Sequence, residues 1–233
     1  MTRSKALDRL EGVFAEARRR SLIGNLSFEV QRAHSEGFLR ALWLENVDGP
    51  VLELGSGGGL PGLVLAVEDQ DLHLVLLDSA RRSADFLRWA VEELQLSSRV
   101  EVVNARAEQL GREEGYRGSF TVVVARSFGP PAVTAECAAP LLRVGGRLIV
   151  SEPPGKDSQT TRATKALLPR ADRWPAEGCE KLGLTPELDI REAFGFAVLR
   201  QVSPCSDRYP RRPGIPAKRP LFSQEPPAKP TSR

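Results

Sequence analysis

A carboxylate and three glycines occupy alternate positions at residues 53–59. The pattern begins within residues 51–54, a short and mostly apolar run that predicts a buried strand. The alternating residues are Glu53, Gly55, Gly57 and Gly59. Glycine reaches backbone angles closed to other residues, and its missing side chain lets a ligand touch the main chain. Because helical spacing of apolar residues resumes at 60–67, the stretch predicts a strand, a turn and a helix that together hold a ligand.

The spacing of these glycines favours one class of ligand over another. A dinucleotide turn follows G-x-G-x-x-G, with the third glycine packed against the strand and the helix N-terminus facing a pyrophosphate. Leu60 occupies that third position here. The observed order, E-x-G-x-G-x-G, favours a cationic ligand without a phosphate, with Glu53 as its expected anionic partner. S-adenosylmethionine is such a ligand, so the turn predicts a methyltransferase in preference to a dehydrogenase.

A second apolar run, residues 73–77, ends at the carboxylate of Asp78, about twenty residues beyond the glycine turn. Ribose-binding acids of nucleotide-binding βαβ units occupy this position. We therefore expect Asp78 to accept hydrogen bonds from the ribose hydroxyls of the donor. The alternative role for this carboxylate is to cap a helix that starts at Ser79.

Two further strands are predicted at residues 100–104 and 120–125, and a basic residue follows each. Arg106 follows the first and Arg126 the second. The ligand crevice of an open parallel sheet lies beyond the carboxyl ends of its strands, so both side chains should converge on the glycine turn. The alternative is that both arginines only pair with surface acids such as Glu108.

Hydrophobic spacing along the rest of the chain predicts an α/β fold. Helices are predicted at 5–20, 28–45, 87–94, 131–142 and 158–184, and further strands at 147–151, 187–191 and 195–202. We therefore expect a Rossmann-like class I methyltransferase fold, with a seven-stranded, mostly parallel sheet and helices on both faces. The expected parts are an N-terminal helical cap at 1–48, an S-adenosylmethionine-binding domain at 49–202 and a Pro-rich basic tail at 203–233.

Composition limits the class of protein. With 233 residues, 41% hydrophobic and 27% charged, the chain can form one substantial α/β domain with extensions. It contains no apolar run long enough to span a membrane and no apolar secretion signal, so we expect a cytoplasmic protein without a membrane partner. Its three widely spaced cysteines fit neither a disulfide framework nor a metal site, and we expect reduced thiols and no bound metal.

Basic charge is concentrated at the C-terminus. Residues 203–233 hold seven Lys or Arg and two acids, so they contribute +5 to a net charge of +3, and residues 1–202 carry −2. They also hold eight of the 18 prolines, which predicts an extended tail outside the packed core. We expect its cations to contact RNA phosphates without affecting donor binding. The candidate contacts are Arg211, Arg212, Lys218 and Arg219. The alternative is that Tyr209 and residues 220–222 pack against the domain, so that removing the tail would also destabilise the fold.

A second basic run, Arg18 to Arg20, ends the first predicted helix. It is interpreted either as an RNA contact or as a solvated charged face.

Together these motifs resemble the bacterial 16S ribosomal RNA guanine-N7 methyltransferases, the RsmG or GidB family. The resemblance covers about residues 30–221. The matching segments are L-G-S-G-G-G-L-P-G at 54–62, L-L-D-S at 76–79, F-L at 86–87, N-A-R-A-E at 104–108, V-A-R-S-F at 124–128 and Y-P-R-R-P-G-I-P-A-K-R-P-L at 209–221. The resemblance implies an S-adenosylmethionine-dependent methyltransferase that acts on 16S ribosomal RNA or the small ribosomal subunit.

The resemblance also implies roles for individual residues. Those implied to contact the donor are Gly55, Leu60, Ala107, Glu108 and Arg126. Arg106 and Arg126 would lie at the RNA-facing mouth of the cleft. The chain departs from the family in two segments: Glu152-Pro153-Pro154-Gly155 replaces the usual Lys-Gly, and Arg126-Ser127-Phe128 replaces the usual R-A-F.

Methylation at guanine N7 has modest chemical requirements. N7 carries a lone pair directed into the major groove, so it can attack a sulfonium methyl without first losing a proton. We therefore expect that no residue transfers a proton, and Arg126 is a candidate for positioning the reactants. We also expect a monomer. Alignment of the reacting atoms would account for the rate enhancement. Two alternatives remain open: a methyltransferase of a small metabolite, and a non-catalytic RNA- or protein-binding module on a methyltransferase fold.

Overall fold

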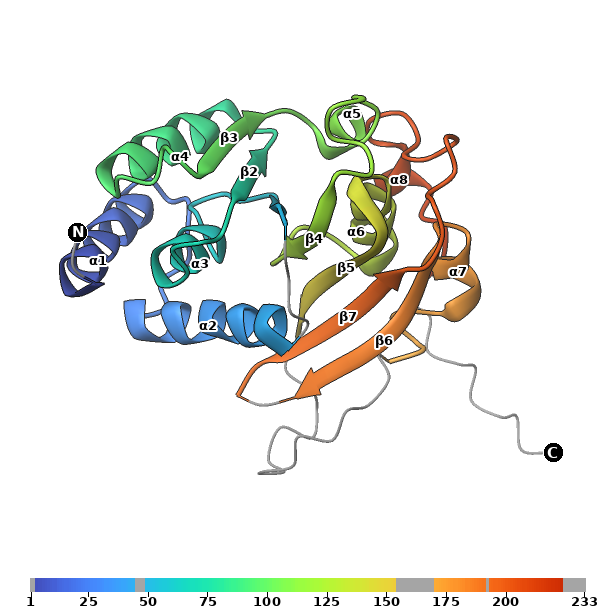
Figure 1. The fold of residues 1–233 in the computed structure, drawn as a ribbon, viewed down its shortest axis with the longest axis horizontal. Helices are drawn as coiled ribbons and strands as arrows, with labels where there is room; N and C mark the ends of the chain where they lie inside the picture. The colour runs from blue at the N-terminus through green and yellow to red at the C-terminus, as the bar shows by residue number, and fades with distance from the viewer. Residues whose placement is uncertain (1–2, 45–48, 154–169, 192, 224–233) are drawn as a thin grey trace.

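The computed structural model of the protein describes residues 3–44, 49–153, 170–191 and 193–223. Among these residues, seven strands form one sheet in the order β3-β2-β1-β4-β5-β7-β6. They are β1 Val51–Leu54, β2 Leu74–Asp78, β3 Val100–Asn104, β4 Phe120–Ala125, β5 Leu142–Glu152, β6 Leu184–Arg191 and β7 Gly195–Gln201. The first five run parallel, and β7 is antiparallel to β5 and β6, so the predicted mostly parallel sheet is confirmed (Figure 1).

Helices cover both faces of the sheet. They are α1 Arg3–Arg19, α2 Phe28–Leu44, α3 Gly62–Glu68, α4 Arg81–Glu93, α5 Ala107–Leu110, α6 Pro131–Ala138, the 3₁₀ helix η1 Ala139–Leu141, α7 Ala176–Glu180 and α8 Ile215–Lys218. The first four share one hydrophobic core with the sheet, and α5, α6, η1 and α7 contribute to a second core on the other face (Figure 1). None of the helices in the described part of the chain combines the length and apolar character needed to cross a bilayer.

The alternation of side chains along each strand explains the two cores. In β1, Val51 belongs to the core of α1 to α4, whereas Leu52 and Leu54 belong to the opposite core. In β4, Val122 and Val123 divide in the same way. Because both faces of the central strands are buried, they appear in the sequence as continuous apolar runs.

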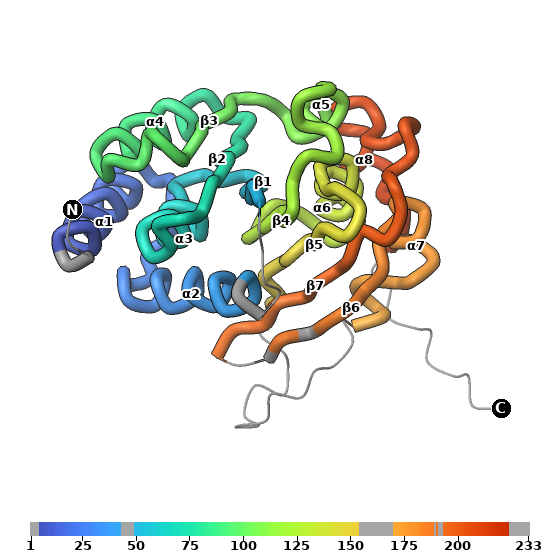
Figure 2. The backbone as a smooth tube through the Cα atoms, in the orientation of Figure 1, coloured from blue at the N-terminus to red at the C-terminus, as the bar shows by residue number. Residues whose placement is uncertain are grey.

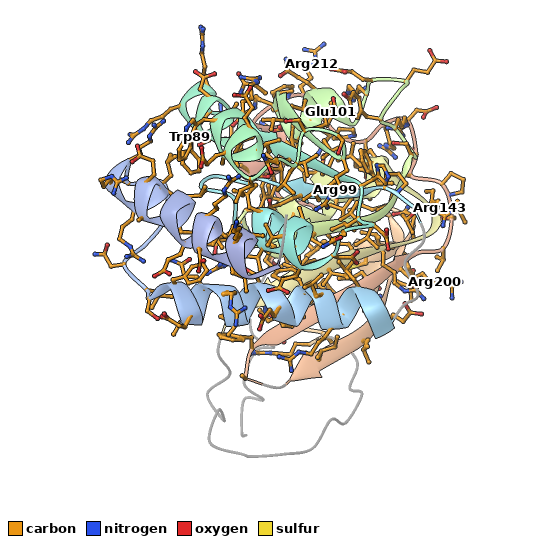
Figure 3. All side chains as sticks on the ribbon, turned by 60° about the vertical axis from the view of Figure 1, so that its left-hand side comes forward. Trp89, Arg99, Glu101, Arg143, Arg200 and Arg212 are labelled. Carbon is orange, nitrogen blue, oxygen red and sulfur yellow. The ribbon has the colours of Figure 1, made fainter. Side chains whose placement is uncertain are left out.

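The two N-terminal helices are packed into the domain. Phe14 of α1 and Phe38 of α2 are each at most 1% exposed and lie in the same core as α3 and α4. The guanidinium of Arg20 stands 5.6 Å from the ring centroid of Phe86 and 5.5 Å from that of Trp89, which is labelled in Figure 3. Such cation–π contacts join the end of α1 to α4. The neighbouring arginines Arg18 and Arg19 also make contacts within the fold, to Leu26 and Glu16.

The prediction of a helix over residues 158–184 is wrong for most of its described part. Residues 158–169 lie outside the described residues, and beyond them only α7 is helical among residues 170–184. Gly183 has a φ of 76°, a left-handed angle that follows the end of α7 and leads into β6. Trp174 and Leu182 are buried against the sheet, so their apolar character reflects core packing of a mostly irregular segment.

The prediction that the C-terminal tail stays outside the core is wrong for residues 203–223. Cys205 and Tyr209 are at most 9% exposed and join the core that includes α5 and α6. Arg117 donates hydrogen bonds to their main-chain carbonyls, at 2.8 Å and 2.9 Å. Proline-rich backbone can therefore pack closely when an arginine satisfies its carbonyl groups. The segment lies beside α5 and α6 and ends near α7 (Figure 2), while residues 224–233 are outside the described part.

Candidate active site

The glycine turn between β1 and α3 uses glycine at left-handed positions. The φ angles are 69° at Gly55, 51° at Gly57 and 87° at Gly59, in a region that other residues rarely enter. The main-chain N–H of Gly55 donates to the carbonyl of Leu77 at 2.8 Å, which joins the turn to the end of β2. A Cβ on Gly55 would stand 2.8 Å from the ring of Phe128. The turn therefore presents bare backbone beside this ring.

Asp78 connects the turn to the start of α4. Its Oδ2 accepts the main-chain N–H of Gly57 at 2.8 Å, and its Oδ1 accepts that of Ala80 at 2.7 Å. The helix begins at Arg81 with Ala80 as its N-cap residue, so Asp78 does not hold the cap position itself, although its carboxylate binds the main chain at the helix start, as the capping alternative requires. Each oxygen of an ionised carboxylate has a second lone pair. Ribose binding by Asp78 therefore stays a prediction that this geometry permits.

A cavity of about 350 Å³ lies at the carboxyl ends of the strands, beside the turn. The predicted site residues that line it are Gly55, Asp78, Arg106, Ala107 and Glu108. Its volume falls within the usual range for small-molecule pockets. Two carboxylates, a bare glycine backbone and small side chains fit a cationic donor that carries a ribose. We refer to this space as the donor cavity.

Glu108 joins two distant parts of the chain at the donor cavity. The residue is 6% exposed, and its Oε1 accepts the main-chain N–H of Gly214 at 2.8 Å. The guanidinium of Arg106 lies 3.4 Å from the same oxygen. Burial opposes ionisation, but the hydrogen bonds from main-chain N–H groups and from Arg106 lower the pKa of Glu108 below its ordinary value. The group is therefore anionic at neutral pH, and Arg106 does pair with it.

The structure does not bring Glu53 to the donor cavity. Glu53 shares the face of Val51, is 1% exposed, and its Oε2 accepts the main-chain N–H of Gly62 at 3.2 Å. Burial raises its pKa to about 8, so it is largely protonated at neutral pH and is not the expected anionic partner. The other predicted donor contacts that lie outside the cavity lining are Gly57, Leu60 and Arg126.

Arg126 directly follows β4 and lies near Glu53 of β1 and His34 of α2. Its Nη1 is buried without a hydrogen-bond partner, and burial lowers its pKa, although the nearby Glu53 acts in the opposite direction. Its charge also acts on the imidazole of His34. A buried, unpartnered guanidinium N–H at a strand end is a donor available to a ligand, so a positioning role stays a prediction.

A second cavity, of about 340 Å³, adjoins the first and is called the acceptor cavity below. Both are lined by Ser127 and Phe128. Its other lining includes His34 from α2, Glu152 at the end of β5, and Arg173. No motif in the sequence marks these three residues as a site. The available signal was the position of Glu152 at the carboxyl end of a strand, where ligand-binding residues gather in such sheets.

The predicted RNA contacts differ in their surroundings. Arg211 donates from Nε and Nη2 to the two oxygens of Glu136, at 2.8 Å and 2.5 Å, and Glu136 has no exposed side chain. Its guanidinium therefore anchors the C-terminal segment, which corrects the expectation of a cation extended toward RNA. Arg212, Lys218 and Arg219 are exposed, and Arg212 points outward in Figure 3.

Comparison with known proteins identifies the family. The family model described as "GidB: rRNA small subunit methyltransferase G" matches residues 38–167, which is more than half of the chain. The ribosomal RNA small subunit methyltransferase G of Rubrobacter xylanophilus is 36% identical over 173 residues, covering 74% of this chain and 65% of the relative. The corresponding protein of Moorella thermoacetica is 35% identical over 174 residues, covering 73% and 69%.

Solved structures support the fold assignment. An O-methyltransferase from Bacillus cereus in complex with SAH is 18% identical, with a TM-score of 0.55 over 83% of this chain and 90% of that one. The cofactor-bound Rv0187 from MTB is 19% identical, with a TM-score of 0.56 over 84% and 90%. The fold is that of class I methyltransferases, and the resemblance noted in the motifs is confirmed. The chain belongs to the rRNA small subunit methyltransferase G (GidB) family of S-adenosylmethionine-dependent methyltransferases.

Proposed function

We propose that this protein transfers the methyl group of S-adenosylmethionine to N7 of a guanine in 16S ribosomal RNA. The observation that carries the proposal is the pair of adjoining cavities at the carboxyl edge of the sheet, in a chain of this family. The donor supplies an electrophilic methyl on a sulfonium. The S–CH₃ bond breaks as the N7–CH₃ bond forms, so the positive charge passes from sulfur to the guanine ring.

The donor cavity has the surroundings expected of a site without a general base. Asp78 and Glu108 each accept main-chain N–H groups, so their oxygens hold the turn and the C-terminal segment in place. Burial raises the pKa of the Cys137 thiol, which keeps it protonated. Because the N7 lone pair needs no deprotonation, these groups have only to position and shield the reactants.

Exposed cations near the donor cavity suit an RNA partner. Ala217 of α8 lines the cavity, and Arg212, Lys218 and Arg219 on the same segment are exposed. Arg106 is 51% exposed at its side chain and lines the cavity too. These positions would let phosphates of the small subunit RNA bind beside the reacting base. We propose that the enzyme works as a monomer, because one chain supplies both cavities. Attack on a sulfonium needs no metal. The enzyme would act in the cytoplasm, where ribosomal subunits are assembled.

Methyl transfer with a labelled donor tests this proposal. Full-length protein is incubated with 30S subunits lacking N7-methylguanine, with stripped 16S RNA, and with a pool of small metabolites. We expect label in one guanine of the RNA, mapped by cleavage specific for N7-methylguanine. Label confined to the metabolite pool would refute the proposal in favour of a small-molecule methyltransferase, and donor binding without any transfer would favour a binding module.

A further inference from the structure

The donor and acceptor cavities are separated only by a shared wall. Ser127 and Phe128 line both, so a ligand in one cavity lies next to a ligand in the other. Ser127 has a φ of 55°, a left-handed angle that costs energy for a residue with a side chain. Strain of this kind persists where the surroundings hold it, often at functional sites. A methyl group passing from donor to acceptor would cross at this wall, so the second cavity is suited to hold the target base.

An ion pair forms one side of the acceptor cavity. Nε of Arg173 lies 2.5 Å from Oε2 of Glu152, and the indole N–H of Trp174 donates to Oε1 at 2.9 Å. The side chain of Glu152 is 2% exposed and that of Arg173 is 20% exposed. An ionised carboxylate offers about four acceptor positions. Two are engaged within the fold, so the carboxylate retains acceptor capacity and the guanidinium retains N–H donors for a ligand.

We propose that Glu152 and Arg173 recognise the Watson–Crick edge of the target guanine, an inference that rests on the proposed function. The adjacent N1–H and N2–H donors of guanine match the two carboxylate oxygens, and O6 matches a guanidinium donor. Adenine presents an unprotonated N1, whose lone pair would face the carboxylate. N7 lies on the Hoogsteen edge, beyond O6 from N1 and N2. A guanine held by its Watson–Crick edge therefore keeps N7 free for the methyl group.

The other side of the acceptor cavity is formed by a neutral imidazole. The ring of His34 stacks on Phe194, with centroids 4.4 Å apart and an interplanar angle of 9°, and its Nε2 lies 2.8 Å from Oγ of Ser151. Burial, and then the nearby charge of Arg126, lowers the pKa of His34 to about 4. The imidazole is therefore neutral at neutral pH and adds no positive charge to those of Arg126 and Arg173, and the carboxylate of Glu152 lies on the same cavity to oppose them.

Nucleotide binding tests this inference without RNA and without methyl transfer. Full-length protein saturated with S-adenosylhomocysteine is titrated with GMP, IMP and AMP, and binding is followed by ligand-observed NMR. IMP lacks the N2 amino group, and AMP lacks both this group and the N1 proton. Because each lost hydrogen bond involves a charged group, we expect GMP to bind about tenfold more tightly than IMP, and IMP more tightly than AMP. Equal affinity of the wild-type protein for GMP and AMP would overturn the proposal.

Two variants separate the roles of the pair. Glu152→Gln replaces one acceptor oxygen by a donor NH₂, so the ratio of GMP to IMP affinity should fall close to one. Arg173→Lys removes the planar donor fork, so GMP and IMP should weaken by similar factors with their ratio kept. A ratio measured within one variant does not depend on the fraction of folded protein. A Glu152→Gln variant with the wild-type ratio contradicts the proposal.

Glu187→Gln is the matched control. It removes a carboxylate of the same sheet that lies 3.2 Å from Nε of Arg147 and 3.8 Å from Nη1 of Arg200, away from the acceptor cavity. All three nucleotides should bind it as they bind the wild type.

Methylation of 30S subunits is measured in parallel. Wild-type protein that prefers GMP but transfers no methyl to RNA refutes the proposed function and supports the guanine pocket. Unchanged methylation by Glu152→Gln refutes the pocket alone.

Discussion

The carboxylate of Glu108 accepts a hydrogen bond from the main-chain N–H of Gly214 at 2.8 Å, across 106 positions of sequence. The contact places the C-terminal segment against a residue that lines the donor cavity, and Ala217 of that segment lines the cavity as well. Donor binding is therefore expected to depend on residues 203–223, in contrast to the independence predicted from their composition.

Glu108→Ala tests this dependence. It removes the acceptor of the part-buried Gly214 N–H and a carboxylate that lines the cavity, which should weaken donor binding by about 1 to 3 kcal/mol. Isothermal titration with S-adenosylmethionine measures the change. Glu114→Ala, at an exposed position beyond α5, is the control and should bind as the wild type does. Identical affinities for the two variants would show that the Glu108 contact does not shape the cavity.

Adjacent arginines of the C-terminal segment should behave differently. Arg211→Ala leaves the buried carboxylate of Glu136 without its ion-pair partner, so we expect a loss of about 3 to 5 kcal/mol in the free energy of unfolding. Arg212→Ala changes an exposed cation and should leave unfolding unaffected. It should instead reduce, by nearly one unit, the slope of the logarithm of the RNA-binding constant against the logarithm of the salt concentration. A slope equal to that of wild type would remove Arg212 from the RNA contacts.

Gly57→Val should abolish donor binding for a backbone reason. A Cβ at this position would meet no atom closer than 3.8 Å, so there is room for a side chain, but the φ of 51° is strained for a β-branched residue. Release of that strain would break the hydrogen bond from Gly57 to Asp78. Gly57→Asn is the matched variant, because asparagine tolerates left-handed angles. Calorimetry should show donor binding by Gly57→Asn and none by Gly57→Val. Equal binding by both variants would exclude backbone strain as the cause.

Glu53 should give the protein a pH-dependent stability. Burial raises its pKa from 4.5 to about 8 in the folded state, so between these values the folded protein holds a proton that the unfolded chain has lost. The contribution is fully present below about pH 4.5 and falls as the pH rises toward 8, by at most about 1.4 kcal/mol per pH unit. Denaturant unfolding of wild type and Glu53→Gln from pH 5 to 8 isolates this contribution. If the difference between the two curves does not change with pH, the carboxyl is not protonated in the fold.

Features that depend on residues close together in the chain can be inferred from the sequence. The left-handed positions at Gly55, Gly57 and Gly59 were predictable because only glycine adopts such angles readily, and Asp78 follows its strand within the same βαβ unit. The seven-stranded sheet followed from apolar runs whose length and period suit strands. The side of the sheet to which Glu53 points could also have been inferred, because residues 51 and 53 of a strand share one face.

Which distant side chains meet depends on the folded structure. Glu152 is joined to Arg173, Glu136 to Arg211 and Glu108 to Gly214, across 21, 75 and 106 positions of sequence. Local patterns carry no record of these pairings, because the fold brings the partners together and burial makes the pairing favourable. The basic, proline-rich C-terminus shows the consequence. Its composition is typical of a solvated tail, but the segment packs because Arg211 pairs with the buried carboxylate of Glu136 and Tyr209 is buried in the core. Leaving the Glu136 charge unpaired inside the fold would cost more free energy than ordering the segment does.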